Sequence, residues 1–270
     1  MGVTRLLRVD DVASLGFRTD LVLRRLGGSL VSDRGSHLVV RTPENPGYWW
    51  GNFLLLREQP GVGEWPGWVA EFEREFPGAD HIALGLDGVD GAVPDPEGAA
   101  ALGLEVMVDA VLTATELTPP APADLLIRPL ESSDDWHSMA LLRLSLEESS
   151  ADDHAEFVHR KAAEYRQMTQ AGHGVWFGAF VDGEMRCGAG LFTDGSGVAR
   201  FQNVETHPAY RRRGLASTLV HRLGEWGLSS MGAEKLVIVA DPGYHAIGMY
   251  RALGFEDAEH KIQAQRPPSG

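Results

Sequence analysis

The most informative run of residues in this chain is Val204-Glu205-Thr206-His207-Pro208-Ala209-Tyr210-Arg211-Arg212-Arg213-Gly214-Leu215-Ala216. Its order is typical of a strand, a short basic turn and the start of a helix. Pro208 ends the strand because proline has no N–H group for a sheet ladder. Gly214 lets the backbone approach a ligand closely, and the first N–H groups of a helix have no intrahelical partner. The run therefore predicts a site for a phosphate or pyrophosphate group.

Helical periodicity after the turn supports this interpretation. Apolar residues recur on one face of the predicted helix, at Leu215, Leu219, Val220, Leu223 and Trp226. The small Ala216 lies where the helix would approach a ligand most closely, and the three arginines supply charge to a polyanion. Taken alone, the run is also compatible with an ordinary surface helix that follows a basic turn.

Chain length and one proline-rich segment predict two domains. The 270 residues exceed the usual size of a single domain. Residues 117–124 contain three prolines and no periodicity, which is typical of a linker. We therefore expect a domain over residues 1–118, a linker over 119–123, and a second domain over 124–270.

Composition and charge narrow the class of protein. The chain is 43% hydrophobic and 23% charged, as in ordinary soluble proteins, and no apolar segment is long enough to cross a bilayer. A secretion signal is not recognisable at the N-terminus, and the lone Cys187 has no partner for an internal disulfide. We expect a cytoplasmic protein without a membrane partner. The net charge of −14 argues against nucleic acid and leaves the three arginines suited to a small polyanion.

The second half has a clear order of expected elements. A strand over 124–130 precedes a helix capped near Ser132 and a second helix over 155–170. A hairpin over 175–192, turning at Asp182-Gly183, leads to the strand that ends at Thr206. After the helix from Leu215 we expect a buried strand over 235–241, a short helix over 245–253 and a final strand. The order is β-α-α-β-β-β-α-β-α-β, a mixed α/β class.

Two motifs within this order carry a resemblance to a known family. Arg211-Arg212-Arg213-Gly214-Leu215-Ala216 matches the pattern Arg/Gln-x-x-Gly-x-Gly/Ala, and residues 245–255 look like the segment Ala-x-x-x-Tyr-x-x-x-Gly-Phe. With a buried strand between them, they make residues 124 to about 260 resemble the GNAT family of acetyl-CoA-dependent N-acyltransferases. The resemblance implies a GNAT fold and acetyl-CoA as the cofactor.

The resemblance also implies roles for individual residues. The cofactor pyrophosphate would be bound by Arg211, Arg212, Arg213, Gly214, Leu215, Ala216 and Ser217. The pantetheine arm would pair with Val204, Glu205 and Thr206, where this strand separates from residues 235–241. Tyr250 would lie at the thioester sulfur and protonate the departing thiolate, because a phenol has a pKa near that of a thiol.

The general base is less well defined. The family often places an acid or histidine on the strand before the turn, but here those positions hold Arg200 and Gln202. Glu205 is the candidate catalytic carboxylate, although strict strand alternation places it on the opposite face from Val204 and Thr206 unless a bulge intervenes. Ordered water is the alternative base. A second departure is Gly243, where many relatives carry an asparagine that contacts the cofactor.

The first half is expected to be a degenerate GNAT-like domain, which makes the architecture tandem. Strands over 37–41, 49–56 and 81–85, helices over 11–25, 65–76 and 96–102, and an extended segment over 104–115 follow a trimmed GNAT order. The loop over 61–64 before the second helix carries no basic residue. An unrelated α+β domain is the alternative.

The expected function is acetyl transfer from coenzyme A to the amine of a small molecule. Four acids, Glu147, Glu148, Asp152 and Asp153, suggest a cationic acceptor. A non-catalytic acyl-CoA sensor and an acetyltransferase acting on a protein amine are the alternatives. No histidine pair has the spacing of a metal site, since His154 and His159 are five residues apart. We expect a monomer or a homodimer and no metal.

Overall fold

A computed structural model describes residues 11–121, 125–146 and 152–268, and in it the chain divides into two units. Unit 1 comprises the chain up to Val111, Val239–Pro242, and the chain from Ala258 onward. Unit 2 comprises Leu112–Ile238 and Gly243–Asp257. Unit 1 thus includes a C-terminal segment that the sequence-based division assigns to the second domain. Residues 119–121 of the proposed linker fall in unit 2, and residues 122 and 123 lie outside the described part of the chain.

The elements of unit 1 begin with a capped helix. The complete elements of this unit are α1 (Leu15–Leu26), β1 (Leu30–Asp33), β2 (His37–Arg41), β3 (Phe53–Leu56), α2 (Trp65–Glu75), β4 (Ile82–Leu86) and α3 (Pro96–Ala101). Two longer strands belong to it in part: β5 (Glu105–Ala114) as far as Val111, and β11 (Glu256–Arg266) from Ala258 onward. The strand order is β1-β2-β3-β4-β11-β5, with β3 and β4 parallel and β4 and β11 antiparallel. This mixed sheet confirms the predicted fold class.

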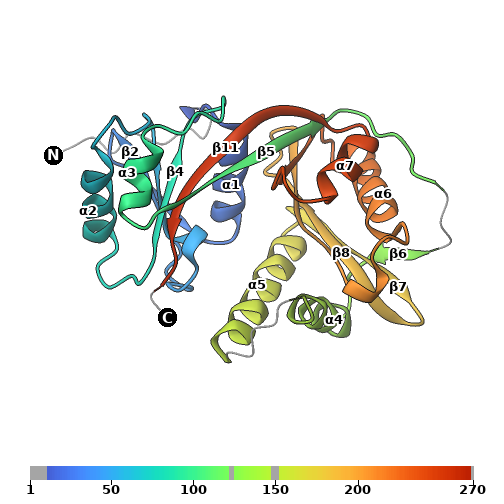
Figure 1. The fold of residues 1–270 in the computed structure, drawn as a ribbon. Coiled ribbons are helices and arrows are strands. Elements are labelled where there is room, and N and C mark those ends of the chain that lie inside the picture. The colour runs from blue at the N-terminus through green and yellow to red at the C-terminus, as the bar shows by residue number, and fades with distance from the viewer. Residues whose placement is uncertain (1–10, 122–124, 147–151, 269–270) are drawn as a thin grey trace. The chain divides into compact units, whose positions relative to one another are not determined.

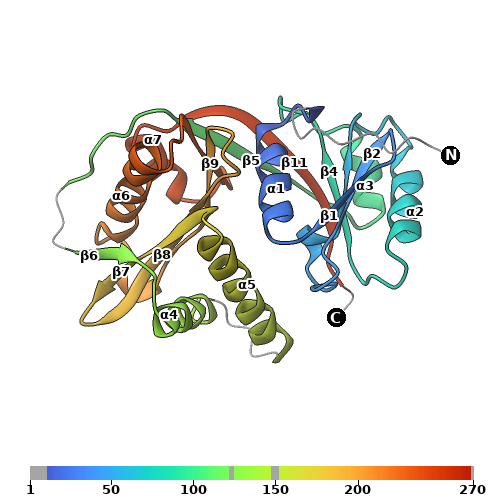
Figure 2. The ribbon, with the colours of Figure 1, turned by 180° about the vertical axis from the view of Figure 1, so that it is seen from behind.

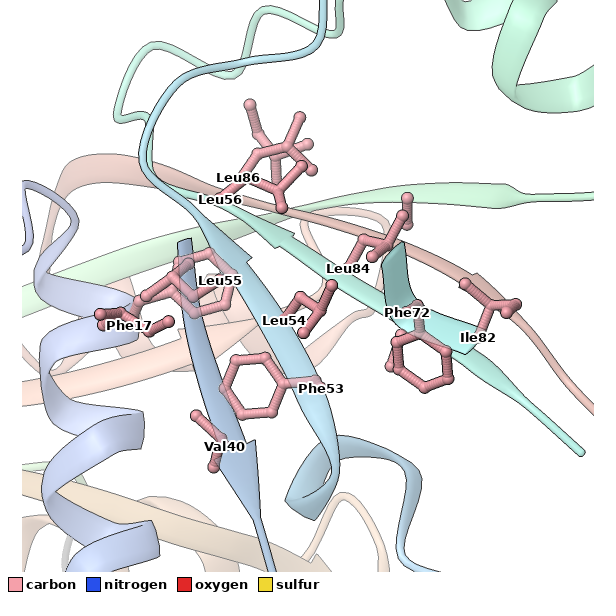
Figure 3. Close-up of a cluster of buried hydrophobic side chains, with 14 of the residues drawn as sticks. Phe17, Val40, Phe53, Leu54, Leu55, Leu56, Phe72, Ile82, Leu84 and Leu86 are labelled. Atoms are coloured by element: carbon pink, nitrogen blue, oxygen red, sulfur yellow. The ribbon is translucent and has the colours of Figure 1, made fainter. Parts of the chain in front are cut away.

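Helices cover both faces of the unit 1 sheet, as Figures 1 and 2 show. Phe17 of α1 stacks with Phe53 of β3, whereas Phe72 of α2 meets the ring of His81 just before β4. Figure 3 shows Phe17 beside Leu55 and Phe72 on the side of Ile82 and Leu84. A Cβ at Gly85 would lie 2.6 Å from the Phe17 ring, so α1 packs closely on the sheet only because residue 85 is glycine.

One predicted strand of unit 1 is wrong at its start. Trp49–Gly51 forms a 3-10 turn, and the strand begins only at Phe53. The side chain of Asn52 causes the turn: its Nδ2 donates to the Tyr48 carbonyl oxygen at 2.9 Å, and its Oδ1 accepts from the Thr42 N–H at 3.0 Å. These bonds give the backbone a local alternative to a sheet ladder. The sequence pattern also missed the short strand β1.

Unit 2 follows the predicted order of elements. It contains β6 (Leu126–Pro129), α4 (Ser133–Leu144), α5 (Asp152–Gln170), β7 (Gly174–Val181), β8 (Glu184–Phe192), β9 (Val198–Thr206), α6 (Leu215–Ser230), β10 (Lys235–Ala240, to Ile238 in this unit) and α7 (Ala246–Ala252). The strands lie in the order β10-β9-β8-β7-β6, and only the β9–β10 pair among these is parallel. The hairpin turns at Asp182 and Gly183, both with positive φ, as the Asp-Gly pair predicts.

Successive aromatic residues of β7 bind the helices of unit 2 to opposite faces of its sheet. Trp176 contacts Trp136 of α4 and Tyr165 of α5. Its neighbour Phe177 points the other way and contacts Trp226 of α6. Figure 1 accordingly shows α4 and α5 on one side of β7 and β8, and α6 and α7 on the other. Strand alternation thus separates an α4/α5 face from an α6/α7 face.

Among the described residues, the helices are all too short or too polar to span a lipid bilayer.

Candidate active site

The turn between β9 and α6 has the backbone geometry of an anion site. The chain leaves β9 through the 3-10 turn Pro208–Tyr210. Arg212 and Gly214 then adopt left-handed conformations, with φ of 58° and 80°. The Arg211 Nε–H donates to the Thr206 carbonyl oxygen at 3.3 Å and ties the turn to the end of the strand. A Cβ on Gly214 would meet no atom within 4 Å, so the glycine faces open space.

The N-terminus of α6 lacks the side-chain cap that α1 and α4 have. In α1 the Ser14 hydroxyl accepts from the Phe17 N–H, and in α4 the Ser132 hydroxyl accepts from the Asp135 N–H. At α6 the N-cap is Gly214, which has no side chain to accept a bond. The hydroxyls of Ser217 and Thr218 instead both donate to the Gly214 carbonyl oxygen, at 3.0 and 2.8 Å.

The first N–H groups of α6 are therefore left for a ligand. They lie at the positive end of the helix dipole and beside two arginines, a combination that favours phosphate.

A cavity of about 600 Å³ joins this turn to the predicted catalytic residues. Its lining comes from α4, β9, the turn, α6 and α7, all within unit 2. The lining residues are Arg143, Leu146, Val204, Glu205, Thr206, Tyr210, Arg211, Arg212, Gly214, Leu215, Ala216, Ser217, Tyr244, His245, Ala246, Met249 and Tyr250. The predicted site residues are thus brought together, with one exception. Arg213 is not part of the lining, and its guanidinium lies over the Tyr210 ring, 4.9 Å from the centroid.

A β-bulge in β9 determines which way Glu205 points. Gly190 pairs with Gln202 and Gly188 with Glu205, so three steps along β9 match two along β8. The extra residue is accommodated where Asn203 adopts a φ of 46°. Gln202 and Glu205 consequently share the α4/α5 face: the Tyr165 hydroxyl of α5 bonds to Gln202, and Glu205 contacts α4.

Glu205 is buried and forms an ion pair across the cavity lining. Its side chain is 8% exposed, and its Oε1 accepts a hydrogen bond from Nη1 of Arg143 on α4. Arg143 is one-third exposed. A buried carboxylate needs such a partner, since an unpaired charge in this position carries a large desolvation cost.

Tyr250 approaches the cavity from the α6/α7 face. It is 5% exposed and lies on α7. Burial raises the pKa of its phenol above the usual range, with smaller contributions from Cys187 and Tyr244. The phenol is therefore neutral at physiological pH and retains its proton for donation.

Cys187 packs near Tyr250 as a thiol. Its Sγ lies 3.2 Å from the Thr206 hydroxyl oxygen, and burial raises the pKa of the thiol to about 12. A buried thiol of this kind is a poor nucleophile, so Cys187 contributes to packing.

β9 and β10 pair only at their beginnings. Their register runs through Val198, Ala199 and Arg200 opposite Lys235, Leu236 and Val237, and no further β9–β10 pair occurs in the described part of the chain. The β9–β10 ladder therefore ends before the edge of β9 that lines the cavity, Val204 to Thr206. An extended amide-containing ligand is suited to that edge.

Sequence reasoning missed several residues of the lining. Arg143 is the most important of them. It lies on α4 one turn after the buried Met139 and next to the buried Leu142, and a charged residue inside an apolar stripe was the available signal. Arg200 and Gln202 do not line the cavity. Glu147 and Glu148 lie outside the described residues, and the side chains of Asp152 and Asp153 are likewise outside them.

The loop before α2 in unit 1 is closed by the protein's own carboxylates. Oε2 of Glu64 accepts the Gly61 N–H at 2.7 Å, and Oδ2 of Asp95 accepts the Gly63 N–H at 3.0 Å. These acids satisfy two N–H groups of the loop, and their negative charges repel an anion. A second cavity beside this loop has a volume of about 470 Å³ and is lined by Ser36, His37, Gly63, Glu64, Gly67, Trp68 and Glu71.

A His37, Glu71 and Glu75 cluster near this second cavity has metal-ligating residue types. Glu75, however, forms ion pairs with Arg34 and Arg41, and Glu71 with Arg74. Three arginines thus neutralise the two carboxylates, which disfavours a cation at this cluster.

Comparisons with known proteins agree with the geometry. Residues 139–255 match the Acetyltransferase (GNAT) family. Among solved structures, the chain is similar to a functionally unknown conserved protein from Staphylococcus epidermidis (TM-score 0.73, 12% identity, covering 90% of this chain and 95% of that one). It is also similar to a GCN5-related N-acetyltransferase from Kribbella flavida (TM-score 0.62, 18% identity, 93% and 94% covered).

A third similar structure is described as a tandem GNAT protein from the clavulanic acid biosynthesis pathway (TM-score 0.55, 16% identity, 97% and 94% covered). The comparison with curated proteins finds no match. At these identities the structural similarity shows the fold, which spans most of the chain and includes a tandem example. Together with the cavity of unit 2, the family match identifies residues 139–255 as a GNAT acetyltransferase domain.

Proposed function

We propose that the protein transfers an acetyl group from acetyl-CoA to the amine of a small molecule. One observation supports this proposal above the others. A single cavity of unit 2 contains an uncapped helix N-terminus with two arginines, a neutral buried tyrosine and a buried carboxylate. These are the groups that binding a pyrophosphate, protonating a thiolate and accepting a proton from an amine require.

The residues present fit coenzyme A. Arg211 and Arg212, with the N–H groups that follow Gly214, would hold the pyrophosphate. The open space over Gly214 would admit it, and the edge of β9 from Val204 to Thr206, beyond the β9–β10 ladder, would hydrogen-bond the amides of the pantetheine arm. When bound, acetyl-CoA would supply the activated acyl group. Arg213 would contribute through its backbone and its contact with Tyr210.

The transfer itself needs one proton acceptor and one proton donor. The amine nitrogen forms a bond to the thioester carbonyl carbon, and the carbon–sulfur bond breaks. Glu205 accepts the proton that the amine loses, directly or through water, and the Tyr250 hydroxyl gives its proton to the departing thiolate sulfur. The raised pKa of Tyr250 keeps the phenol in its protonated form before the transfer.

A non-catalytic acyl-CoA sensor is the second candidate. The observation that favours it is the Arg143–Glu205 ion pair, which engages the candidate base in the structure. A sensor would bind acetyl-CoA without needing this carboxylate to accept a proton.

Thiol release from acetyl-CoA, measured with a panel of amines, separates the two candidates. For an enzyme we expect amine-dependent release that falls roughly 100- to 10,000-fold in Glu205→Gln or Tyr250→Phe, with acetyl-CoA binding retained. Binding of acetyl-CoA without turnover on any amine would favour the sensor. Absence of both binding and turnover would overturn the proposal.

A further inference from the structure

Two neighbouring aromatic rings, Tyr244 and His245, form an exposed part of the unit 2 cavity that the proposed chemistry does not use. Their ring centroids are 4.1 Å apart, and both residues belong to the cavity lining. Tyr244 is 47% exposed, although its side chain is large and mostly apolar. A single exposed tyrosine is ordinary on a protein surface. One that lines a cavity and contacts a second ring offers a flat surface to a planar ligand.

The strand topology places this ring pair at the same end of the sheet as the candidate pyrophosphate turn. β9 and β10 are parallel, so the segments that follow them leave the sheet at the same end. The turn with Arg211 and Arg212 follows β9, and Tyr244 follows β10. Both segments line the same cavity, and all three side chains are exposed. The exposed ring and the exposed arginines therefore border the same end of the cavity.

Exposure falls along α7 from this end towards the candidate proton donor. Tyr244, just before the helix, is 47% exposed, whereas Tyr250, within it, is 5% exposed. Ala246, Met249 and Tyr250 line the cavity at helical spacing. With the thioester at Tyr250 and the pyrophosphate at the turn, the pantetheine arm of the cofactor spans the distance between them. The nucleoside, attached beyond the pyrophosphate, is the part left for the exposed end.

A second tyrosine beside the turn, Tyr210, already has contacts on its ring. The guanidinium of Arg213 lies 4.9 Å from the ring centroid and that of Arg186 lies 4.7 Å from it. His207 also meets this ring edge-on. A planar ligand would compete with these contacts at Tyr210. In the described part of the chain, the only ring contact of Tyr244 is with the adjacent His245, so Tyr244 is the more accessible surface for stacking.

We infer that Tyr244 stacks on the adenine of coenzyme A, with His245 packed against the tyrosine ring. The inference rests on the proposed use of coenzyme A and holds for an enzyme and for a sensor alike. Aromatic side chains bind bases through the π-face that every base has, so no hydrogen-bonding partner for the adenine is required. The nucleoside then adds to the affinity for the cofactor. The chain is expected to discriminate against an acyl group carried on phosphopantetheine alone, because that donor lacks the adenine.

Binding measurements on the full chain test this inference with the whole cofactor and its two halves. Calorimetry gives the affinity for acetyl-CoA. Displacement of acetyl-CoA gives the affinities for adenosine 3′,5′-bisphosphate, which contains the adenine without the arm, and for S-acetyl-4′-phosphopantetheine, which contains the arm without the adenine.

Variants of Tyr244 show whether this ring binds the adenine. Tyr244→Ala should weaken acetyl-CoA and the nucleotide by a similar factor, roughly 5- to 150-fold, and leave the arm unaffected. Tyr244→Phe keeps the ring, so all three affinities should stay within about threefold of those of the unmodified protein. Leu141→Ala is the matched control, because Leu141 is 51% exposed on α4 and lies outside the cavity lining. It should change no affinity.

The outcomes distinguish this inference from the proposed function. A loss for acetyl-CoA and the arm, but not for the nucleotide, would place Tyr244 on the pantetheine arm and overturn the inference. Unchanged affinity for acetyl-CoA in Tyr244→Ala would overturn it as well. So would a nucleotide that does not displace acetyl-CoA from the unmodified protein, a result that does not depend on whether a variant folds. If the unmodified protein does not bind acetyl-CoA at all, the proposed function itself is rejected.

Discussion

The Glu64 carboxylate accepts a hydrogen bond from the Gly61 N–H at 2.7 Å in the loop before α2. Asp95 does the same for Gly63. At the turn before α6 the N-cap is Gly214, which has no side chain and no side-chain cap. The two loops therefore differ in one chemical respect: in the unit 1 loop, backbone donors are already used by acids of the protein.

We predict that the chain binds one acetyl-CoA molecule, in unit 2. Titration calorimetry should give a stoichiometry of one, and replacing both Arg211 and Arg212 by glutamate should remove binding altogether. Asp194→Asn, in a turn outside the cavity lining, is the control and should leave binding unchanged. A stoichiometry of two, or residual binding in the double arginine variant at the affinity of the unmodified protein, would contradict the assignment.

Gly214 should be required for cofactor binding more than for folding. Asparagine tolerates a left-handed backbone, so Gly214→Asn should cost less than about 1 kcal/mol of the free energy of unfolding. Its side chain would enter the open space over the turn, and the affinity for acetyl-CoA should fall about tenfold or more, equivalent to about 1.4 kcal/mol.

Gly195→Asn is the matched control for this prediction, because Gly195 has a φ of 87° and equally open surroundings but does not line the cavity. Thermal unfolding reports the stability of each variant, and calorimetry reports its affinity for acetyl-CoA. Equal affinities for acetyl-CoA in both variants would show that the space over Gly214 is not the cofactor site.

Tyr250→Phe should remove the proton donor without disturbing the fold. We expect kcat to fall roughly 100- to 10,000-fold while the dissociation constant of acetyl-CoA changes less than about threefold. Because burial raises the pKa of Tyr250, its ionisation should cause no loss of activity below about pH 10, the ordinary pKa of tyrosine. The pH profile of kcat tests the prediction about ionisation, and calorimetry tests whether acetyl-CoA binding is retained. A variant with unchanged kcat would exclude the phenol as the acid.

The pKa of Glu75 predicts acid sensitivity in unit 1. Hydrogen bonds from Arg34 and Arg41 lower this pKa from 4.5 to about 2. The carboxylate therefore stabilises the fold above pH 4.5, the ordinary value, and this contribution is lost as the pH falls towards 2. Both arginines are partly exposed, which weakens the pairs through solvent screening.

Glu75→Gln should accordingly lower the free energy of unfolding at neutral pH by about 1–3 kcal/mol. Denaturant unfolding between neutral pH and pH 3 should show the difference from the unmodified protein shrinking as the pH falls. Glu156→Gln, which removes a surface pair with Arg160, is the control and should change stability by less than about 0.5 kcal/mol. A difference that does not depend on pH would contradict the assignment.

The parts of the site that the sequence predicts are those encoded locally. The turn around Gly214, the Asp182-Gly183 hairpin and the helix that carries Tyr250 each depend on a few adjacent residues with strong backbone preferences. The Arg143–Glu205 pair joins two elements that are distant in the chain, and no local pattern indicates which arginine meets which carboxylate. The bulge at Asn203 cannot be predicted locally either, because its position depends on how β9 pairs with β8.

The register of β4 with β11 is a further long-range feature. Ile262 pairs with Leu86 and Arg266 with Ile82, and these residues are far apart in the sequence. The single-sequence pattern indicated a final strand but gave no indication that it joins β4, or that the chain from Ala258 belongs to unit 1.

This pairing has a consequence for biosynthesis. The part of β11 that joins β4 is translated after the whole of unit 2, so the ribosome must finish the acetyltransferase domain before unit 1 can complete its sheet. Until then β4, with its fully buried apolar residues, has an open edge in the nascent chain. Premature termination after Phe255 would therefore keep every residue that lines the unit 2 cavity and leave unit 1 without the strand that pairs with β4.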